Sequence, residues 1–189
     1  MTPVLAPSIP VPDRICAAFL TCIERDGLRA TSLDDVATEA GCGRATIYRV
    51  IPGGRGGLLR AAIQFSLDMI IDRCRAGVSG AATLEAAVAR SLHTAAVMLD
   101  GSAALQRLLA EEPGAILPYL SFDGLQPLLA RIAEVSPLLF GPFGTDAQSR
   151  SAGEWIARVV IGHLRSPGGP VDLTDPEHCR RLVALFFIP

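Results

Sequence analysis

The sequence has no lysine, few aromatic residues and no long apolar run. All seventeen basic residues are arginine, which we interpret as the mark of a GC-rich coding genome and not as a functional signal. Aromatic residues make up 5% of the chain although hydrophobic residues make up 50%. The apolar content is therefore carried by Ala, Leu, Val and Ile, which favours packed helices over sheets. A charged fraction of only 19% excludes a disordered chain.

Membrane, export and metal signals are missing as well. No apolar run reaches the roughly 18 residues of a membrane span. The N-terminus has prolines at positions 3, 7, 10 and 12 and no basic region before an apolar one, so a signal peptide is not expected. The five cysteines are odd in number and scattered, which argues against a disulfide framework or a zinc site and for small core residues. We expect a soluble, cytoplasmic protein without membrane, metal or cofactor.

Signatures of catalysis and nucleotide binding are also absent. The chain contains no Gly-x-Ser-x-Gly, His-Glu-x-x-His or Cys-x-x-Cys motif, and only 3 histidines. Its glycine-rich segment, residues 53–57, lacks the Gly-Lys-Ser/Thr ending of a phosphate-binding loop. The sequence therefore predicts that the protein is not an enzyme.

Positive charge gathers in the first part of the chain. Residues 1–77 carry nine Arg and eight acidic residues, a net charge of +1, whereas residues 78–189 carry eight Arg and eleven acidic residues, a net charge of −3. Four arginines follow one another with no acidic residue between them, namely Arg44, Arg49, Arg55 and Arg60. Because electrostatic footprints on nucleic acid are local, this stretch is a candidate phosphate-binding strip. The alternative is a solvated helix face, which would normally mix signs.

The spacing of apolar residues predicts an all-helical chain with no strands. The proline-rich segment 1–12 is expected to be a mobile, non-helical arm. Helices are expected over residues 13–26, 33–40, 43–50, 55–75, 81–99, 102–111, 114–135, 147–165 and 175–187. The seventh of these contains Pro118 and Pro127 and should be kinked or split. It should be followed by a loop that begins at Ser136 and Pro137.

The second and third predicted helices have the pattern of a helix-turn-helix. Two helices that cross steeply need a small residue at their contact and a turn residue that tolerates positive φ. Ala37 and Gly41 meet these demands, and the facing apolar residues are Val36, Ala40, Ile47 and Val50. Ser32, with an acid three residues later at Asp35, resembles a capping box at the start of the second helix.

The wider stretch from Arg14 to Ile63 resembles the N-terminal domain of the TetR family of bacterial transcription regulators. The matching segments are Asp26-Gly27-Leu28 at the end of the first helix, Ala30-Thr31-Ser32-Leu33-Asp34-Asp35-Val36-Ala37, Ala40-Gly41, Thr46-Ile47-Tyr48-Arg49, and Pro52 before the leucines of the fourth helix. The resemblance implies that the third helix enters the major groove of DNA. The positions that it implies as DNA contacts are Thr31, Ser32, Arg44, Ala45, Thr46, Tyr48, Arg49 and Arg55.

These positions have different expected roles. Arg44 is the residue best able to read a guanine bidentately, and Ala45 is placed to approach a thymine methyl group. Thr31 and Ser32 would present free backbone N–H groups to a phosphate, although Ser32 serves equally well as a simple helix cap.

The sequence departs from the family pattern after the third helix. Val50-Ile51-Pro52 stands where a histidine and an aromatic-Pro unit are usual, and Gly53-Gly54-Arg55-Gly56-Gly57 replaces the usual Ser-Lys pair. The family's phosphate-binding lysine is therefore absent, and Arg55 is the candidate to replace it. The glycines either let backbone amides approach a phosphate as an anion nest or fray the helix.

The second half resembles the same family more loosely, in the order of its helices and in its ending. The resemblance implies that the last two helices of two subunits form a four-helix dimer interface, for which Trp155, Val159, Leu182 and Phe186 are candidates. An effector pocket is expected among the middle helices near His93, Met98, Tyr119, Phe122 and Trp155. For both sets the alternative is that the residues belong to the intramolecular core.

Taken as a whole, the sequence predicts a homodimeric regulator that binds double-stranded operator DNA and leaves it when a small, hydrophobic effector binds. The predicted parts are an arm over 1–12, a helix-turn-helix domain over 13–57, and a helical effector-binding and dimerisation domain over 58–189 reached through the long fourth helix. The alternative function is a helical ligand-binding or scaffold protein with weakened DNA binding.

Overall fold

The structure is a computed structural model that describes residues 9–165 and 170–187. Within these ranges every regular element is helical, in the order α1 (Val11–Asp26), α2 (Leu33–Glu39), α3 (Arg44–Val50), α4 (Gly54–Val78), α5 (Leu84–Asp100), α6 (Ala103–Glu111), α7 (Pro113–Ile116), η1 (Leu117–Leu120), α8 (Phe122–Phe140), η2 (Gly141–Phe143), α9 (Asp146–Arg165) and α10 (Pro176–Phe186). The predicted all-α class is confirmed. None of the helices in these ranges is long and apolar enough to cross a membrane.

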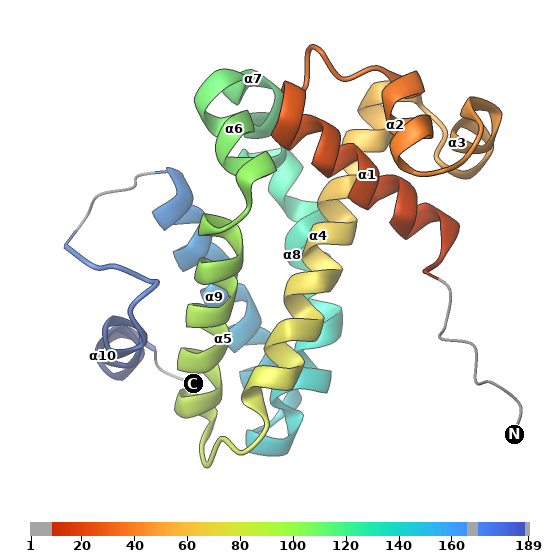
Figure 1. Ribbon diagram of the computed structural model, residues 1–189. Helices are drawn as coiled ribbons and strands as arrows, with labels where there is room; N and C mark the ends of the chain where they lie inside the picture. Colours follow the sequence, from red (N-terminus) through yellow and green to blue (C-terminus); the bar gives the residue numbers. More distant parts are fainter. Residues whose placement is uncertain (1–8, 166–169, 188–189) are drawn as a thin grey trace, which may run out of the picture.

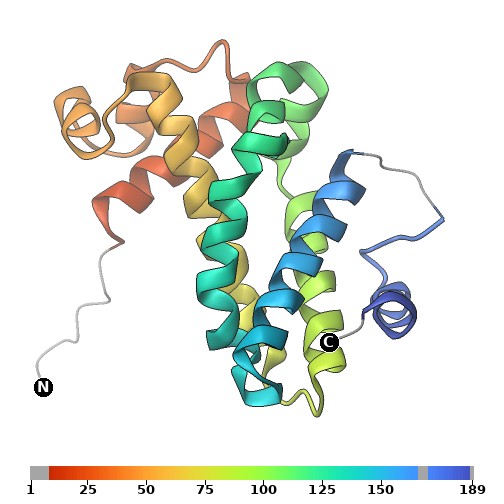
Figure 2. The same ribbon diagram turned by 180° about the vertical axis from the view of Figure 1, so that it is seen from behind.

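Helix α4 runs the length of the molecule and joins its two ends (Figure 1). At one end, α1, α2 and α3 surround the start of α4, and α6 packs against α1. Along the rest of α4 lie α5 and α8; α9 packs against α8 and α5, and α10 packs on the outside of α5 (Figure 2).

The first helix begins earlier than predicted. It starts at Val11 with Pro10 as its N-cap residue, so positions 11 and 12 do not belong to a non-helical arm; residues 1–8 of that predicted arm lie outside the described ranges. A proline is tolerated at Pro12 because the first turn of a helix has no use for its missing N–H group. Gly27, with φ of +82°, ends the helix.

The region predicted as one helix over 114–135 is split, as its prolines suggested. The break falls at η1, which contains Pro118, whereas Pro127 lies inside α8. The predicted loop at Ser136 and Pro137 is wrong, because α8 continues to Phe140. Pro137 removes one helical hydrogen bond, but continuing the helix buries Leu139 and Phe140 in the core, which more than offsets that loss.

The described helices enclose two hydrophobic cores that meet within α4. The first core holds the apolar faces of α1, α2 and α3 together with Leu58, Leu59 and Ala62 of α4, and it also takes Ala104 and Leu108 from α6. The second core begins at Leu67 and is built from α4, α5, α8, α9 and α10. A segment late in the chain thus completes the core of the N-terminal helices, and α4 belongs to both cores.

Candidate functional site

Helix α2 begins at a capping box, as the sequence predicted. Ser32 Oγ accepts the Asp35 N–H at 3.1 Å, and the Asp35 carboxylate accepts the Ser32 N–H at 2.9 Å. Hydrogen bonds from the Ser32 side chain and backbone lower the pKa of Asp35, so the carboxylate stays ionised and the cap stays closed at neutral pH.

The turn between α2 and α3 has the geometry of a helix-turn-helix. Gly41 has φ of +60°, a conformation that glycine adopts without a Cβ penalty, and the Cys42 N–H donates to the Ala37 carbonyl oxygen at 2.9 Å. The predicted facing residues Val36, Ala40 and Ile47 are buried, and Val50 packs against them. The two helices are therefore fixed against each other and against α1.

Helix α3 turns one face inward and a polar face outward. Ile47 is only 2% exposed, whereas Tyr48 is 47% exposed. Arg44, Ala45 and Arg49 are also exposed, and Thr46 is half-buried. The exposed residues of α3 include four of the five that the sequence predicted at the DNA, and the fifth, Thr46, is half-buried beside them.

The Arg44 side chain is held on this surface by contacts with two neighbouring residues. Its guanidinium donates to Asp34 of α2 at 3.1 Å and to the Tyr48 hydroxyl at 3.4 Å, and its central carbon lies 5.7 Å from the centre of the Tyr48 ring. The Tyr48 hydrogen bond and then the charge of Asp34 raise the pKa of Arg44. Both side chains of the ion pair are more than half exposed, so the pair contributes little to stability and readily gives way to a competing anion.

The predicted contacts at Thr31 and Ser32 are not available in the way the sequence suggested. Thr31 is buried, and its N–H and hydroxyl both donate to the Gly27 carbonyl oxygen, at 3.2 and 2.7 Å. The Ser32 N–H is held by Asp35. Neither residue has a free backbone N–H group, because the turn before α2 uses both for its own hydrogen bonds.

Arg55 has a structural task that the sequence did not reveal. Its guanidinium donates to the carbonyl oxygens of Arg29 and Thr31 and so fastens the start of α4 to the link between α1 and α2. This use of its donors makes Arg55 a weaker replacement for the family's phosphate-binding lysine than its position suggested.

The glycines around Arg55 shape the turn into α4. Gly53 and Gly54 have φ of +95° and +59°, which disfavours any other residue. Gly57 lies against the Pro52 carbonyl oxygen, which would be 2.0 Å from a Cβ atom at that position. Helix α4 begins at Gly54 and is not frayed by these glycines.

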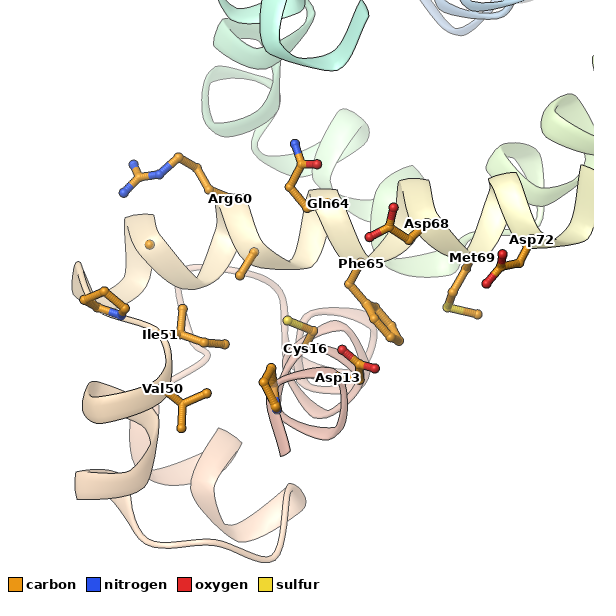
Figure 3. A pocket seen from close by; sticks show the side chains of 14 residues that line it. Asp13, Cys16, Val50, Ile51, Arg60, Gln64, Phe65, Asp68, Met69 and Asp72 are labelled. Atoms are coloured by element: carbon orange, nitrogen blue, oxygen red, sulfur yellow. The ribbon is translucent and has the colours of Figure 1, made fainter. Parts of the chain in front are cut away.

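An open cleft of about 600 Å³ lies beside this turn, between the N-terminal end of α1 and one face of α4 (Figure 3). Phe65 and Met69 of α4 lie on the side toward Asp13 and Cys16 of α1, whereas Arg60, Gln64 and Asp68 follow the opposite edge of α4. Asp68 forms an ion pair with Arg131 of α8 at 3.1 Å, so this carboxylate of the cleft already has a partner within the protein. The cleft is open to solvent and of mixed polarity, which makes it a poor receptor for an apolar molecule.

A second cavity, of about 370 Å³, is apolar and lies between α4, α5, α8 and α9. The described residues of its walls include no Arg, Asp, Glu or His; they are aliphatic apart from Gly153, Phe140, two methionines, Cys74 and four serines. Leu20 of α1 and Leu59 of α4 belong both to its wall and to the first core. This cavity is the best candidate for an effector site.

Of the four predicted pocket residues whose side chains are described, Met98 lines this cavity. His93 lies on another face of α5, where its Nε2 is 3.0 Å from the Thr174 carbonyl oxygen. Tyr119 packs on the first core, and Trp155 packs edge to face on Phe187 with ring centres 5.5 Å apart. Phe122 begins α8, but its side chain is outside those described. His93, Tyr119 and Trp155 therefore do not line this cavity, because the prediction chose polar and aromatic residues, whereas the described walls are mostly aliphatic.

The serines of the cavity differ in their hydrogen bonds. Ser136 donates to the Ile132 carbonyl oxygen at 2.6 Å, and Ser102 caps α6 by accepting the Leu105 N–H. Ser91 is 2% exposed, and among the described residues its hydroxyl has no partner. A buried hydroxyl without a partner costs about 1–3 kcal/mol, so Ser91 is an unusual feature of the wall.

The predicted dimer residues fall into two groups. Trp155, Val159 and Leu182 are half-buried against the second core of their own chain. Phe186 is 64% exposed, and its neighbour Leu185 is 72% exposed. Leu185 was not predicted, although its position beside Phe186 on an amphipathic helix was a usable signal. The end of α10 therefore exposes two large apolar side chains in the described part of the single chain, whereas the exposed residues before them are mostly charged.

The two halves of the molecule are also fastened by polar contacts that the sequence did not suggest. Arg107 of α6 donates to the carbonyl oxygens of Glu24 and Arg25 at the end of α1, at 2.9 and 2.7 Å. Glu112 accepts the Arg29 N–H at 2.8 Å and pairs with the Arg29 guanidinium at 3.3 Å. The segment that follows α5 is thus attached to the helix-turn-helix independently of α4.

The cysteines form no centre of their own. All five are free, and the described residues contain no cluster of metal-ligating side chains. Burial raises the pKa of Cys74 to about 12 and that of Cys16 to about 11, so both thiols stay protonated at neutral pH.

Comparison with known proteins supports the fold. No protein-family model matches the sequence, and no curated protein matches it. Among solved structures, the TetR-family repressor AlkX from a Dietzia strain, implicated in biodegradation of n-alkanes, is 20% identical, with a TM-score of 0.74 over 97% of this chain and 94% of that one. The TetR-family repressor QsdR from R. erythropolis is 15% identical, with a TM-score of 0.58 over 95% of each chain. The transcriptional regulator FadR from Bacillus subtilis, in complex with stearoyl-CoA, is 16% identical, with a TM-score of 0.53 over 90% of this chain and 96% of that one. The chain therefore has the fold found in TetR-family regulators.

Proposed function

We propose that this protein is a transcription regulator of the TetR type: a homodimer that binds operator DNA through α3 and leaves it when a small apolar molecule enters the cavity. The observation that carries the proposal is the polar face of α3. It is exposed on a helix whose other face is buried, inside a helix-turn-helix with a closed capping box. The structural neighbours described as TetR-family repressors agree with it.

Recognition of a base pair would begin with Arg44. A guanidinium can donate two hydrogen bonds to the O6 and N7 atoms of guanine, but Arg44 must first leave Asp34, which is 3.1 Å away. Ala45 would lie against a thymine methyl group. Thr46, Tyr48 and Arg49 would contact phosphates and fix the helix in the groove.

Dimerisation would use the exposed end of α10. Phe186 and Leu185 are large apolar residues that a lone chain leaves in water, and exposed apolar patches of this kind mark interaction sites. A dimer would place two α3 helices about 34 to 36 Å apart, so that they meet successive major grooves.

Release would follow from the position of the cavity. Its wall includes Leu20 of α1 and Leu59 of α4, which also form the core beneath the helix-turn-helix. A molecule that prefers another arrangement of these helices changes the spacing of the two α3 helices and weakens DNA binding, with a typical coupling of about 1–3 kcal/mol. Such a protein would act in the cytoplasm, where operator DNA is accessible.

The test is a mobility-shift assay of the purified protein on its own upstream intergenic DNA, with nonspecific competitor and at two salt concentrations. We expect a discrete, competitor-resistant complex that contains a dimer or a pair of dimers. A smear that disappears with modest salt, on this DNA and on genomic fragments selected by the protein, would contradict specific operator binding.

A second function is favoured by one observation. The family's phosphate-binding lysine is missing, and the donors of Arg55 are used within the chain. The alternative is therefore a helical ligand-binding protein whose DNA affinity is weak. Elution of the protein from a heparin column at low salt, together with ligand binding at full strength, would favour this alternative.

A further inference from the structure

The walls of the apolar cavity define the chemistry of its occupant. Because the described residues that line the cavity include no Arg, Asp, Glu or His, an ionised group that entered it would lose its water and find no countercharge among them. The carboxylate of a fatty acid and the ammonium group of an alkylamine are both disfavoured for that reason. An aliphatic chain, in contrast, meets walls that are mostly aliphatic.

One polar group of the wall is left over for a ligand. Ser136 and Ser102 use their hydroxyls inside the protein, and Ser66 is only half-buried. Ser91, a residue of the cavity wall, is 2% exposed, and its hydroxyl has no partner among the described residues. Its backbone carbonyl oxygen already accepts from the Cys74 thiol at 3.6 Å, so the Ser91 hydroxyl is the one buried side-chain polar atom of the described wall that lacks a partner.

We infer that the cavity takes an uncharged aliphatic molecule with one hydrogen-bonding oxygen, such as an alkan-1-ol, and that this oxygen pairs with the Ser91 hydroxyl. The inference rests on the proposed function only in taking this cavity as the effector site. Burial of the ligand's aliphatic chain supplies the binding free energy. The hydrogen bond to Ser91 makes an alcohol bind more tightly than a plain hydrocarbon of the same length.

The experiment uses the full-length protein without DNA and four ligands of equal chain length: decan-1-ol, decane, decanoate and decylamine. The affinity of each ligand is measured at pH 7 by how well it displaces the neutral fluorescent dye N-phenylnaphthylamine from the protein. We expect decan-1-ol to bind at least about tenfold more tightly than decanoate or decylamine, since a buried charge has no partner. Decanoate should bind more tightly as the pH falls toward the ordinary pKa of a carboxylic acid, because the neutral acid then becomes available.

Two variants test the role of Ser91. Ser91→Ala should weaken decan-1-ol binding about three- to tenfold, the value of one net hydrogen bond, and leave decane binding unchanged. Ser136→Ala is the matched control, because that hydroxyl also lines the cavity but is already bonded to Ile132; it should not alter the preference for decan-1-ol over decane. Ser91→Ala should also have a Tm at or above that of the wild type, since the variant removes an unpartnered hydroxyl.

The inference is overturned if decanoate binds as tightly as decan-1-ol at pH 7, or if Ser91→Ala keeps the full preference for decan-1-ol over decane. Failure of the proposed function has a different signature. Decan-1-ol would then bind as expected in the dye assay but leave the mobility of the operator complex unchanged, which contradicts release and not the class of ligand.

Discussion

The two hydrophobic cores of this protein differ in how closely their side chains are packed. In the first core, Phe19 and Ile23 of α1 and Leu58 of α4 are at most 1% exposed, and five residues of this core border the cavity, namely Leu20, Leu59, Ala62, Ile63 and Leu108. The second core surrounds a cavity of about 370 Å³. Both buried hydroxyls that lack a partner among the described residues, those of Ser91 and Ser149, come from helices of the second core. In the proposed function, the helix that would enter the DNA groove is held by close packing, whereas the part that would bind the effector keeps room and unused polar groups.

The strongest test compares two leucines. Leu58→Ala should lower the free energy of unfolding by about 4–5 kcal/mol, because it opens a new void in a close-packed core. Leu139→Ala should cost only about 2–3 kcal/mol, because Leu139 already borders the cavity and has fewer contacts to lose. Urea denaturation of both variants measures the difference, and equal losses would show that the two cores are packed alike.

A pair of glycines tests the packing beside α3. Gly57→Ala should destabilise the protein by about 1–3 kcal/mol, since its Cβ would meet the Pro52 carbonyl oxygen at 2.0 Å. Gly56→Ala should instead stabilise by about 1 kcal/mol, since a Cβ there meets nothing closer than Arg60 at 3.9 Å and alanine favours a helix. Thermal unfolding of the two variants should move in opposite directions, and a stabilising Gly57→Ala would refute the close fit of this turn.

The next prediction concerns the polar face of α3 and is tested on DNA. Arg44→Ala should reduce discrimination at one base pair by about 1–3 kcal/mol. Tyr48→Phe should weaken binding to all sequences alike, because its hydroxyl is expected at a phosphate. Mobility shifts on the operator and on single-base variants separate the two effects. Unchanged affinities in both variants would remove these residues from the interface.

The smallest expected effect concerns the second unpartnered hydroxyl. Ser149 is fully buried in α9 and does not line the cavity. Ser149→Ala should raise the free energy of unfolding by up to about 1 kcal/mol, because it removes an unsatisfied polar group and favours the helix. Ligand affinity should not change. Lower stability in a calorimetric scan would mean that the hydroxyl has a partner after all.

The sequence predicted best what is decided within one turn of a helix. The capping box of Ser32 and Asp35 and the positive φ of Gly41 depend on neighbours in the chain, and both were predicted correctly. Pro137 was misjudged because its effect depends on what the helix buries beyond it.

Contacts between distant segments could not be predicted. Arg107 donates a hydrogen bond to the carbonyl oxygen of Arg25, 82 residues away in the sequence. No local sequence pattern predicts such a pair. The cavity was missed for a related reason, since His93 and Trp155 stood out in the sequence but point to other partners. The aliphatic residues that do line the cavity are indistinguishable in sequence from those that fill a core.

Leu20 and Leu59 belong both to the wall of the cavity and to the core that supports α2 and α3. If the proposed mechanism couples the two sites through this shared wall, thermodynamic linkage makes the coupling reciprocal: operator DNA must change the affinity for the ligand by the same factor by which the ligand changes the affinity for the operator. In that mechanism the protein on its operator is a poorer receptor than the free protein. A compound ranked on the free protein alone would then look more potent than it is against the DNA-bound protein.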